Sequence, residues 1–311
     1  MTSGRFVNLD TVMMDMVLRV DDLPARGGDA EVFERLVTTG GGFNVMAAAA
    51  RQGVPTLYAG LLGEGPFAEA ARSDVSREGI STPLNRGGLD LGLCIVLLEP
   101  SGERTFVTSP GAEQKVTAEE LERIELRSGD VMYVSGYNFV YPSLRDQVLA
   151  WWPSIPEGVI VAFDPGPRVS DIEAHVLATV LQRTDWILLN DAEAAALCRE
   201  GSTERRATEL ASRVRSGCVI HHGDTGCVVA TRSEGLNQVP AVLATVVDTN
   251  GAGDTHNGVF LANLALGRSP LEAAHRANYA ASVAIGRLGP AQCPPHDEVE
   301  AWYRAFSGSE R

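Results

Sequence analysis

A turn of small residues, Gly251-Ala252-Gly253-Asp254, contains the acid whose chemical use is clearest. The segment from Val246 is predicted to be a strand that leads through this turn into an alanine-rich helix. Glycines at a helix start let backbone N–H groups converge on an anion, aided by the helix dipole. Asp254 would then accept a proton from an attacking hydroxyl beside a site that neutralises a transferring phosphoryl group. The alternative, an acid that only caps the helix, stays open.

Two further helix starts have side chains that could bind ligands. Gly40-Gly41-Gly42 precedes Asn44, whose amide could bind hydroxyl groups, although a flexible turn before a core helix is the plainer interpretation. Asn190 and Glu193 follow a buried apolar run and suit a Mg²⁺ site that works largely through water. The same spacing is typical of a capping box, and both interpretations can hold together.

Short β-branched runs alternate with amphipathic stretches along most of the chain, for example 131–135, 159–163 and 186–189 against 143–152 and 174–183. This alternation predicts βαβ units, and therefore an α/β fold with a mostly parallel sheet. Two segments, at about 12–38 and 91–110, instead read as strand pairs and predict a small separate β-sheet. No linker or repeat divides the chain, so we expect one domain over residues 1–311.

Composition excludes several classes of protein. A net charge of -14 opposes binding to nucleic acid. Lys115 is the single lysine, which rules out a Walker A loop and the strand lysine of protein kinases. The five cysteines are scattered and form no C-x-x-C pair, as expected in a reducing compartment. The N-terminal segment lacks an uninterrupted apolar run, so we expect neither a signal peptide nor a membrane span, and a cytoplasmic protein.

The string from Asp248 to Phe260 resembles the C-terminal signature of the PfkB carbohydrate kinases, the family of ribokinase, fructokinase and adenosine kinase. Residues 39–53 resemble its N-terminal signature. The resemblance implies a ribokinase-like three-layer α/β/α sandwich, with the small sheet as a lid. It implies that Asp254 is the catalytic base and that Gly251, Ala252 and Gly253 form the anion hole. The substrate-binding residues that it implies are Asp15, Gly41, Gly42, Asn44, Arg104 and Asp254.

The same resemblance implies ATP and Mg²⁺ as cofactors. The residues that would contact the nucleotide are Asn190, His221, Gly223, Gly226, Gly251, Gly253 and Asn278. Asn190 and Glu193 would hold Mg²⁺ through water. A loop site for a monovalent cation, K⁺ in the ribokinase branch, would comprise Asp248, Asn250, Ala284, Arg287, Gly289 and Cys293. His221 departs from the threonine or basic residue that is commoner at its position.

The resemblance extends to uncharacterised bacterial sugar kinases of the YegV type through 103–106, 134–137 and 164–168, where Gly166 replaces the usual asparagine. It implies transfer of the γ-phosphate of ATP to a sugar hydroxyl. With only one lysine, a neutral polyol is favoured over a phosphorylated acceptor. A nucleoside kinase and a catalytically silent sugar or nucleotide sensor are the alternatives. A homodimer through the lid is expected as well.

Overall fold

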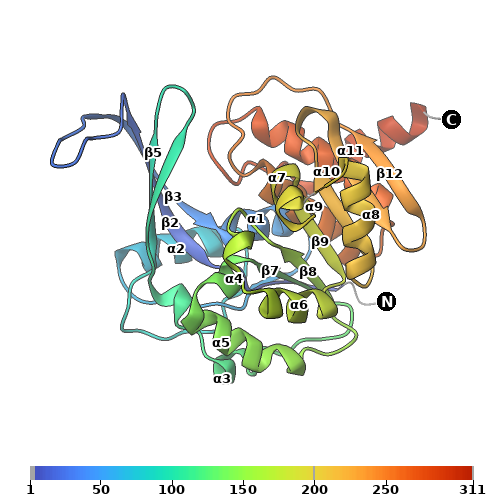
Figure 1. Ribbon diagram of the computed structural model, residues 1–311, viewed down its shortest axis with the longest axis horizontal. Helices are drawn as coiled ribbons and strands as arrows, with labels where there is room; N and C mark the ends of the chain where they lie inside the picture. The colour runs from blue at the N-terminus through green and yellow to red at the C-terminus, as the bar shows by residue number, and fades with distance from the viewer. Residues whose placement is uncertain (1–3, 199, 310–311) are drawn as a thin grey trace.

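The computed structural model describes residues 4–198 and 200–309, which form two sheets (Figure 1). The larger sheet has eight strands in the order β12-β11-β10-β9-β8-β7-β1-β4. Pairing is parallel from β4 to β10, and the β11 and β12 strands are antiparallel. The strands are β1 (Phe6–Asn8), β4 (Thr56–Tyr58), β7 (Val131–Ser135), β8 (Ile160–Asp164), β9 (Trp186–Asn190), β10 (Gly217–His221), β11 (Gly226–Thr231) and β12 (Gly235–Pro240).

Two hydrophobic cores, one on each face of this sheet, make the three layers. Alternate residues of a strand enter different cores: Tyr133 of β7 packs on one side and Met132 on the other. The first core is covered by α1 (Gly42–Arg51), α2 (Pro66–Arg77), α9 (Ala252–Ala265), α10 (Pro270–Ile285) and α11 (His296–Ser309). The second is covered by α3 (Ala118–Leu121), α4 (Tyr137–Val140), α5 (Pro142–Trp151), α6 (Ala174–Arg183), α7 (Asp191–Leu197) and α8 (Thr203–Arg213).

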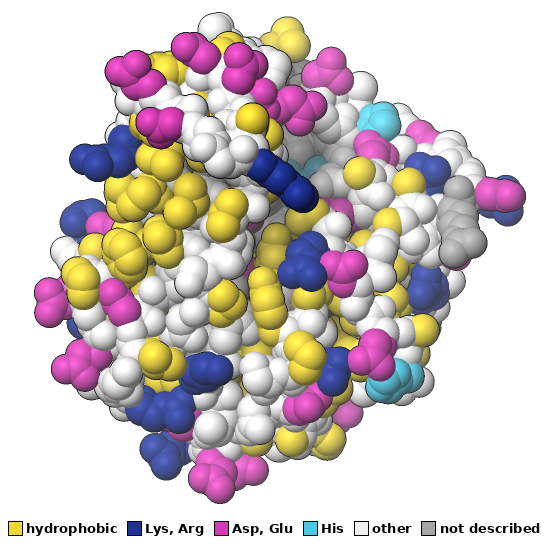
Figure 2. Space-filling model, turned by 60° about the vertical axis from the view of Figure 1, so that its left-hand side comes forward, with side chains coloured by type: hydrophobic (Ala, Val, Ile, Leu, Met, Phe, Trp, Pro, Cys, Tyr) yellow, Lys and Arg dark blue, Asp and Glu magenta, His cyan; other side chains and the backbone are white. Residues whose placement is uncertain are grey.

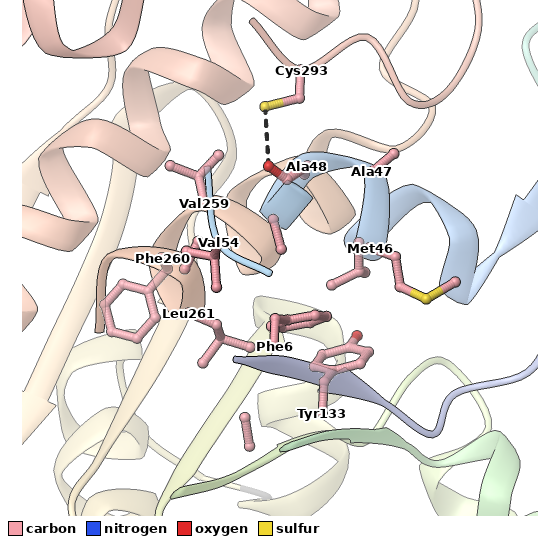
Figure 3. Packing of buried hydrophobic residues seen from close by; sticks show 14 of the residues in the cluster. Phe6, Met46, Ala47, Ala48, Val54, Tyr133, Val259, Phe260, Leu261 and Cys293 are labelled. Carbon is pink, nitrogen blue, oxygen red and sulfur yellow. Dashed lines mark hydrogen bonds between the residues drawn. The ribbon is translucent and has the colours of Figure 1, made fainter. Parts of the chain in front are cut away.

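Helices α1 and α9, which carry the two glycine-rich starts, pack together over the middle of the sheet. Figure 3 shows Met46 of α1 and Val259, Phe260 and Leu261 of α9 above the rings of Phe6 and Tyr133. Gly258 allows this contact, because a Cβ there would lie 2.5 Å from the carbonyl oxygen of Val45. The packing brings the N-termini of both helices to one edge of the sheet.

A second, four-stranded sheet stands off the body and lies at the left in Figure 1. Its order is β3-β2-β5-β6, from β2 (Val12–Val20), β3 (Val32–Gly41), β5 (Leu93–Leu98) and β6 (Arg104–Ser109). We call it the small sheet. Its strands come from the two segments expected at about 12–38 and 91–110, and the predicted fold class is confirmed.

Two elements differ from expectation. Val246 and Val247, predicted to lie in a strand, belong to an irregular segment and are more than half exposed. The edge strand β12 was missed, because its residues are mostly exposed and lack a regular apolar alternation. Short 3₁₀ turns complete the described chain at 112–114, 152–154, 169–171 and 223–225. None of the helices in the described ranges is long and apolar enough to span a membrane.

Candidate active site

Asp254 lies in the first turn of α9, as predicted, and is partly buried at the N-terminal end of that helix. Gly251 caps the helix with a φ of 75°, which favours glycine, and no side chain bonds to the capped end. The side-chain amide of Asn44 donates to Asp254 Oδ2 at 3.0 Å. Burial raises the pKa of Asp254, and the Asn44 bond opposes this rise. A raised pKa brings the carboxyl nearer to the range of an effective general base.

The first turn of α9 leaves backbone donors free. The N–H groups of Gly253 and Asp254 donate no hydrogen bond within the part of the chain that the structure describes, whereas Ala252 and Thr255 bond to the preceding turn. A Cβ on Gly253 would meet nothing closer than His221 Nδ1, at 3.7 Å. The protein itself therefore does not require glycine here, and the open space suits an anion that bonds to these amides.

Asp15 lies in the middle of β2, on the small sheet, and is partly buried. A Cβ on Gly40 would lie 1.9 Å from Asp15 Oδ2, so the carboxylate rests directly on the Gly40 backbone. Burial and the charge of Asp254 raise the pKa of Asp15 to about 7. Asp15 and Asp254 therefore face one region, as predicted for an acceptor site.

Gly41 and Gly42 were predicted to bind substrate, but the contacts that the structure shows for them are packing contacts with the backbone. Gly41 has a φ of 61°, and a Cβ on it would approach the carbonyl oxygen of Thr11 to 2.4 Å. A Cβ on Gly42 would lie 2.7 Å from the carbonyl oxygen of Asp10. These glycines thus let the start of α1 pass close to the chain between β1 and β2.

Asp10 is a buried acid of this region that the sequence analysis missed. It follows β1, is 7% exposed, and has a hydrogen bond from the Thr11 N–H at 2.7 Å and another from the Ser135 hydroxyl, both to Oδ1. Its Oδ2 takes part in no hydrogen bond of the described residues. Burial, with the charge of Asp254 adding to it, raises the pKa of Asp10 to about 7. An acid at the carboxyl end of an apolar strand was the one signal available.

A second group that was missed surrounds Asp164, at the end of β8. Asp164 Oδ2 accepts hydrogen bonds from Tyr133 Oη at 2.9 Å and Asn257 Nδ2 at 2.8 Å. Asn257 Oδ1 is buried and accepts none among the described residues. Burial and the charges of Glu193 and Asp254 raise the pKa of Asp164 well above its usual value. The sequence contained the Asp164 motif but not its link to α9.

Asn190 and Glu193 form the predicted capping box at the start of α7. Asn190 Oδ1 accepts from the Glu193 N–H at 3.0 Å, and Glu193 Oε2 accepts from the Asn190 N–H at 2.9 Å. Burial raises the pKa of Glu193, and the charge of Asp254 adds to this. A divalent cation would relieve the repulsion among Glu193, Asp164 and Asp254. In the described ranges no group of three or more His, Cys, Asp or Glu side chains is placed to hold a metal ion.

On the nucleotide side predicted from sequence, His221 ends β10 and Gly223 to Gly226 form a tight turn. Gly226, with a φ of 105°, leaves no room for a side chain, because a Cβ would lie 2.1 Å from the Val239 carbonyl oxygen. His221 Nε2 lies 3.1 Å from His256 Nδ1, and His256 Nε2 lies 3.1 Å from Asn278 Oδ1. The structure therefore links His221 to Asn278 through a histidine of α9.

The residues expected to form a monovalent-cation site are only partly together. Asp248 accepts hydrogen bonds from the N–H groups of Asn250 at 2.9 Å and Gly289 at 3.1 Å. Ala284 and Arg287 are joined by a backbone bond in the turn after α10. Cys293 instead packs against α1: its Sγ accepts from Gln52 at 3.6 Å.

Two arginines lie at this loop. Arg51 of α1 donates to the carbonyl oxygens of Ala291 at 2.7 Å and Cys293 at 3.0 Å. Arg104, predicted to bind substrate, starts β6 and approaches Asp248 to 3.6 Å. Arg104 thus connects the small sheet to the segment that leads into α9.

A model of the pfkB family of carbohydrate kinases matches residues 5–297, which is nearly the whole chain and includes every residue of the candidate site. The chain belongs to this family. Kinase chemistry and the α/β fold with its small sheet, both expected from the signatures, are thereby confirmed.

Three similar proteins agree with this assignment. The uncharacterised sugar kinase YegV of Escherichia coli K12 is 30% identical over 291 residues, covering 92% of this chain and 90% of its own. An ATP-dependent ribose-1-phosphate kinase of Halopiger xanaduensis is 28% identical over 303 residues, 96% of this chain and 97% of its own. The Arabidopsis thaliana ribokinase solved with ribose and ATP superposes with a TM-score of 0.80 at 20% identity, covering 97% and 99% of the two chains.

Proposed function

We propose that this carbohydrate kinase transfers the γ-phosphate of ATP to a hydroxyl group of a neutral sugar, with Asp254 as the general base. The observation that carries the proposal is the position of Asp254, which is partly buried and oriented by Asn44. It lies beside two N–H groups of the α9 N-terminus that donate no bond among the described residues. Base and anion site are side by side, as phosphoryl transfer requires.

In this mechanism Asp15 and Asn44 hold the acceptor, and Asp254 accepts the proton of the attacking hydroxyl. The buried Asn44 Oδ1 accepts no hydrogen bond within the described residues, so it is available to a substrate hydroxyl. The N–H groups of Gly253 and Asp254 would stabilise negative charge on the transferring group. Mg²⁺, when bound near Glu193, would supply further neutralisation. The small sheet would act as the lid that keeps water from the phosphoryl group.

The charges around the acceptor region favour a neutral sugar. The charge of Asp254 adds to the raised pKa of both Asp10 and Asp15, so the acceptor region is acidic. Two arginines that could bind an acceptor phosphate already have acidic partners, Asp248 for Arg104 and Asp171 for Arg168. Carboxylates and an amide oxygen accept hydrogen bonds, so their natural ligand is rich in hydroxyl donors. A phosphorylated acceptor, as named for the Halopiger relative, would require one of these arginines to exchange partners.

The experiment that tests this proposal is ATP consumption with Mg²⁺ across pentoses, ketohexoses, ribose-1-phosphate and nucleosides, with Asp254→Asn as the control. Turnover with a neutral sugar that is lost in the variant supports the proposal. Preference for ribose-1-phosphate or a nucleoside would refute the acceptor class, and binding of sugar or nucleotide without turnover would favour the silent sensor.

The small sheet also supports the proposed homodimer. Its outer strands expose Val32, Phe33, Leu36, Val37, Phe106 and Val107. Figure 2, which brings the left-hand side of Figure 1 forward, shows hydrophobic side chains gathered on that side. Side chains alternate along a strand, so Leu36 and Phe106 lie on one face of the small sheet and Val37 and Val107 on the other. Monomers rarely leave so much apolar surface uncovered, and a second copy would bury one of these faces.

The resemblance to the ribokinase branch also leads us to propose activation by K⁺. Asp248, Asn250 and Gly289 are together, but Arg104 approaches the carboxylate that a cation would use. Rates in K⁺ against tetramethylammonium test it: equal rates would exclude a K⁺ requirement.

A further inference from the structure

A partly buried histidine, His221, and a buried histidine and asparagine, His256 and Asn278, form a hydrogen-bond chain that the proposed mechanism does not use. His256 and Asn278 are 4% and 7% exposed. The rings of His221 and His256 meet edge to face with centroids 4.5 Å apart. The chain joins three elements, β10, α9 and α10, and runs from the anion site to Asn278, which was predicted to contact the nucleotide.

The direction of every bond in this chain follows from its buried end. Asn278 Nδ2 lies 3.0 Å from the carbonyl oxygens of both Val239 and Pro240, so both of its hydrogens are donated there. Asn278 Oδ1 must then accept, which requires a proton on His256 Nε2. In a neutral ring His256 Nδ1 is therefore an acceptor, and the donor that it meets is His221 Nε2–H.

This order leaves His221 Nδ1 without a proton, beside the first turn of α9. A Cβ built on Gly253 would lie 3.7 Å from this nitrogen, so the bare edge of the ring faces the anion site. Burial lowers the pKa of His221 to about 4 and that of His256 well below its usual value, so both rings are neutral at neutral pH. His221 thus forms a wall of the site and does not act as a cationic phosphate ligand.

We propose that His256 is a positioning residue for the nucleotide side of the site: it holds His221 as the Nε2–H tautomer with its ring fixed against Gly253. The inference rests on the proposed function, because the orientation of His221 matters only if nucleotide phosphates bind at the α9 N-terminus. Other polar groups near His221 are Asn257 of α9 and Asp191 of α7, both of which favour its protonated form. Burial outweighs both and keeps the ring neutral, so the contribution of His256 is to select the tautomer and the orientation of that ring.

The first test needs no substitution. Long-range ¹H–¹⁵N NMR correlation of the imidazoles distinguishes the two tautomers directly. We expect one fixed set of signals from each of these rings, both protonated at Nε2, and no titration near neutral pH. A proton on Nδ1 of either ring, or exchange between tautomers, would overturn the assignment.

The second test uses His256→Phe, which keeps an aromatic ring beside Phe260 but removes both nitrogens. We expect the His221 tautomers to interconvert. The Kd for ADP, measured by calorimetry, should rise about three- to tenfold, as for loss of one buried hydrogen bond. The KM for ATP should rise equally, and the KM for the acceptor should not change. His175→Ala, which removes an exposed histidine of α6, is the control and should change none of these values.

Unchanged ADP binding in a folded His256→Phe variant would refute the positioning role. Failure of the proposed function would give a different result from failure of this inference. If no acceptor of the panel were phosphorylated, but the tautomers and the effect on ADP binding were as expected, the proposed kinase activity would be refuted and the role of His256 supported.

Discussion

Replacing Asp10 by asparagine should stabilise the protein above neutral pH, although Asp10 lies in the acceptor region. Burial raises the pKa of Asp10 from 3.8 to about 7, so the folded state binds a proton more tightly than the unfolded chain does. This difference favours folding fully below about pH 4 and is lost as the pH rises toward 7. Above pH 7 the buried carboxylate of Asp10 is charged, and its full desolvation penalty lowers the free energy of unfolding.

The magnitude follows from the two pKa values. Their difference corresponds to about 4 kcal/mol at full ionisation, and this is the largest gain that Asp10→Asn can give. Asparagine can keep both contacts of Asp10 Oδ1, because its amide oxygen can accept from the Thr11 N–H and from the Ser135 hydroxyl. We therefore expect a free energy of unfolding about 2–4 kcal/mol higher than wild type above pH 7, with a difference that shrinks toward pH 4.

Urea unfolding of both proteins at a series of pH values measures this difference. The wild-type curve should fall as the pH rises, and the variant curve should be flatter. Parallel curves, or a variant that is less stable at every pH, would refute the argument that Asp10 is a desolvated carboxylate. Ser135→Ala is a matched control, because it removes a contact of Asp10 but keeps the acid, so its stability should still fall as the pH rises.

Three further substitutions test the site and the small sheet. Asp254→Asn should lower kcat by about 10²–10⁴-fold with an unchanged thermal midpoint, and a kcat near wild type would remove Asp254 as the base. Gly253→Ala should reduce kcat/KM for ATP by roughly tenfold or more through blocking the anion site, with no loss of stability, because its Cβ meets nothing within 3.7 Å; wild-type kinetics would mean that no phosphate lies there. Phe106→Asp should change the sedimentation from that of a dimer to that of a monomer. The control Leu243→Asp, at an exposed loop residue, should leave the sedimentation unchanged. A wild-type protein that sediments as a monomer would contradict the proposed dimer.

Local patterns were sufficient for most of the fold. Strand β7 and helix α6 have the predicted boundaries, because in each the apolar periodicity is regular and turn residues flank it. The Val246–Val247 prediction was wrong for a tertiary reason. These residues have the β-branched composition of a strand, but β12 pairs only with β11 and none of the described strands lies on its other side.

The local geometry of the candidate site was predictable where it lies in one short segment, as with the helix start at Asp254 and the capping box of Asn190. It was not predictable where the contact joins distant segments. Asp10 becomes a buried acid only through β7, 125 residues away, and His221 meets His256 only because α9 packs against β10. In both cases the residues that flank Asp10 or His221 in the sequence do not indicate which distant residue will contact it.

The parallel pairing of β2 with β5 affects the order of folding. β2–β3 and β5–β6 are each local antiparallel hairpins, but their junction pairs Met14 with Leu93. The chain between them includes α1, β4 and α2, all packed on the main body. Because closing so long a loop is costly until its middle is ordered, the small sheet should assemble after the body has condensed. By the same reasoning it should be the first region to open in native-state hydrogen exchange, while the eight-stranded sheet stays protected.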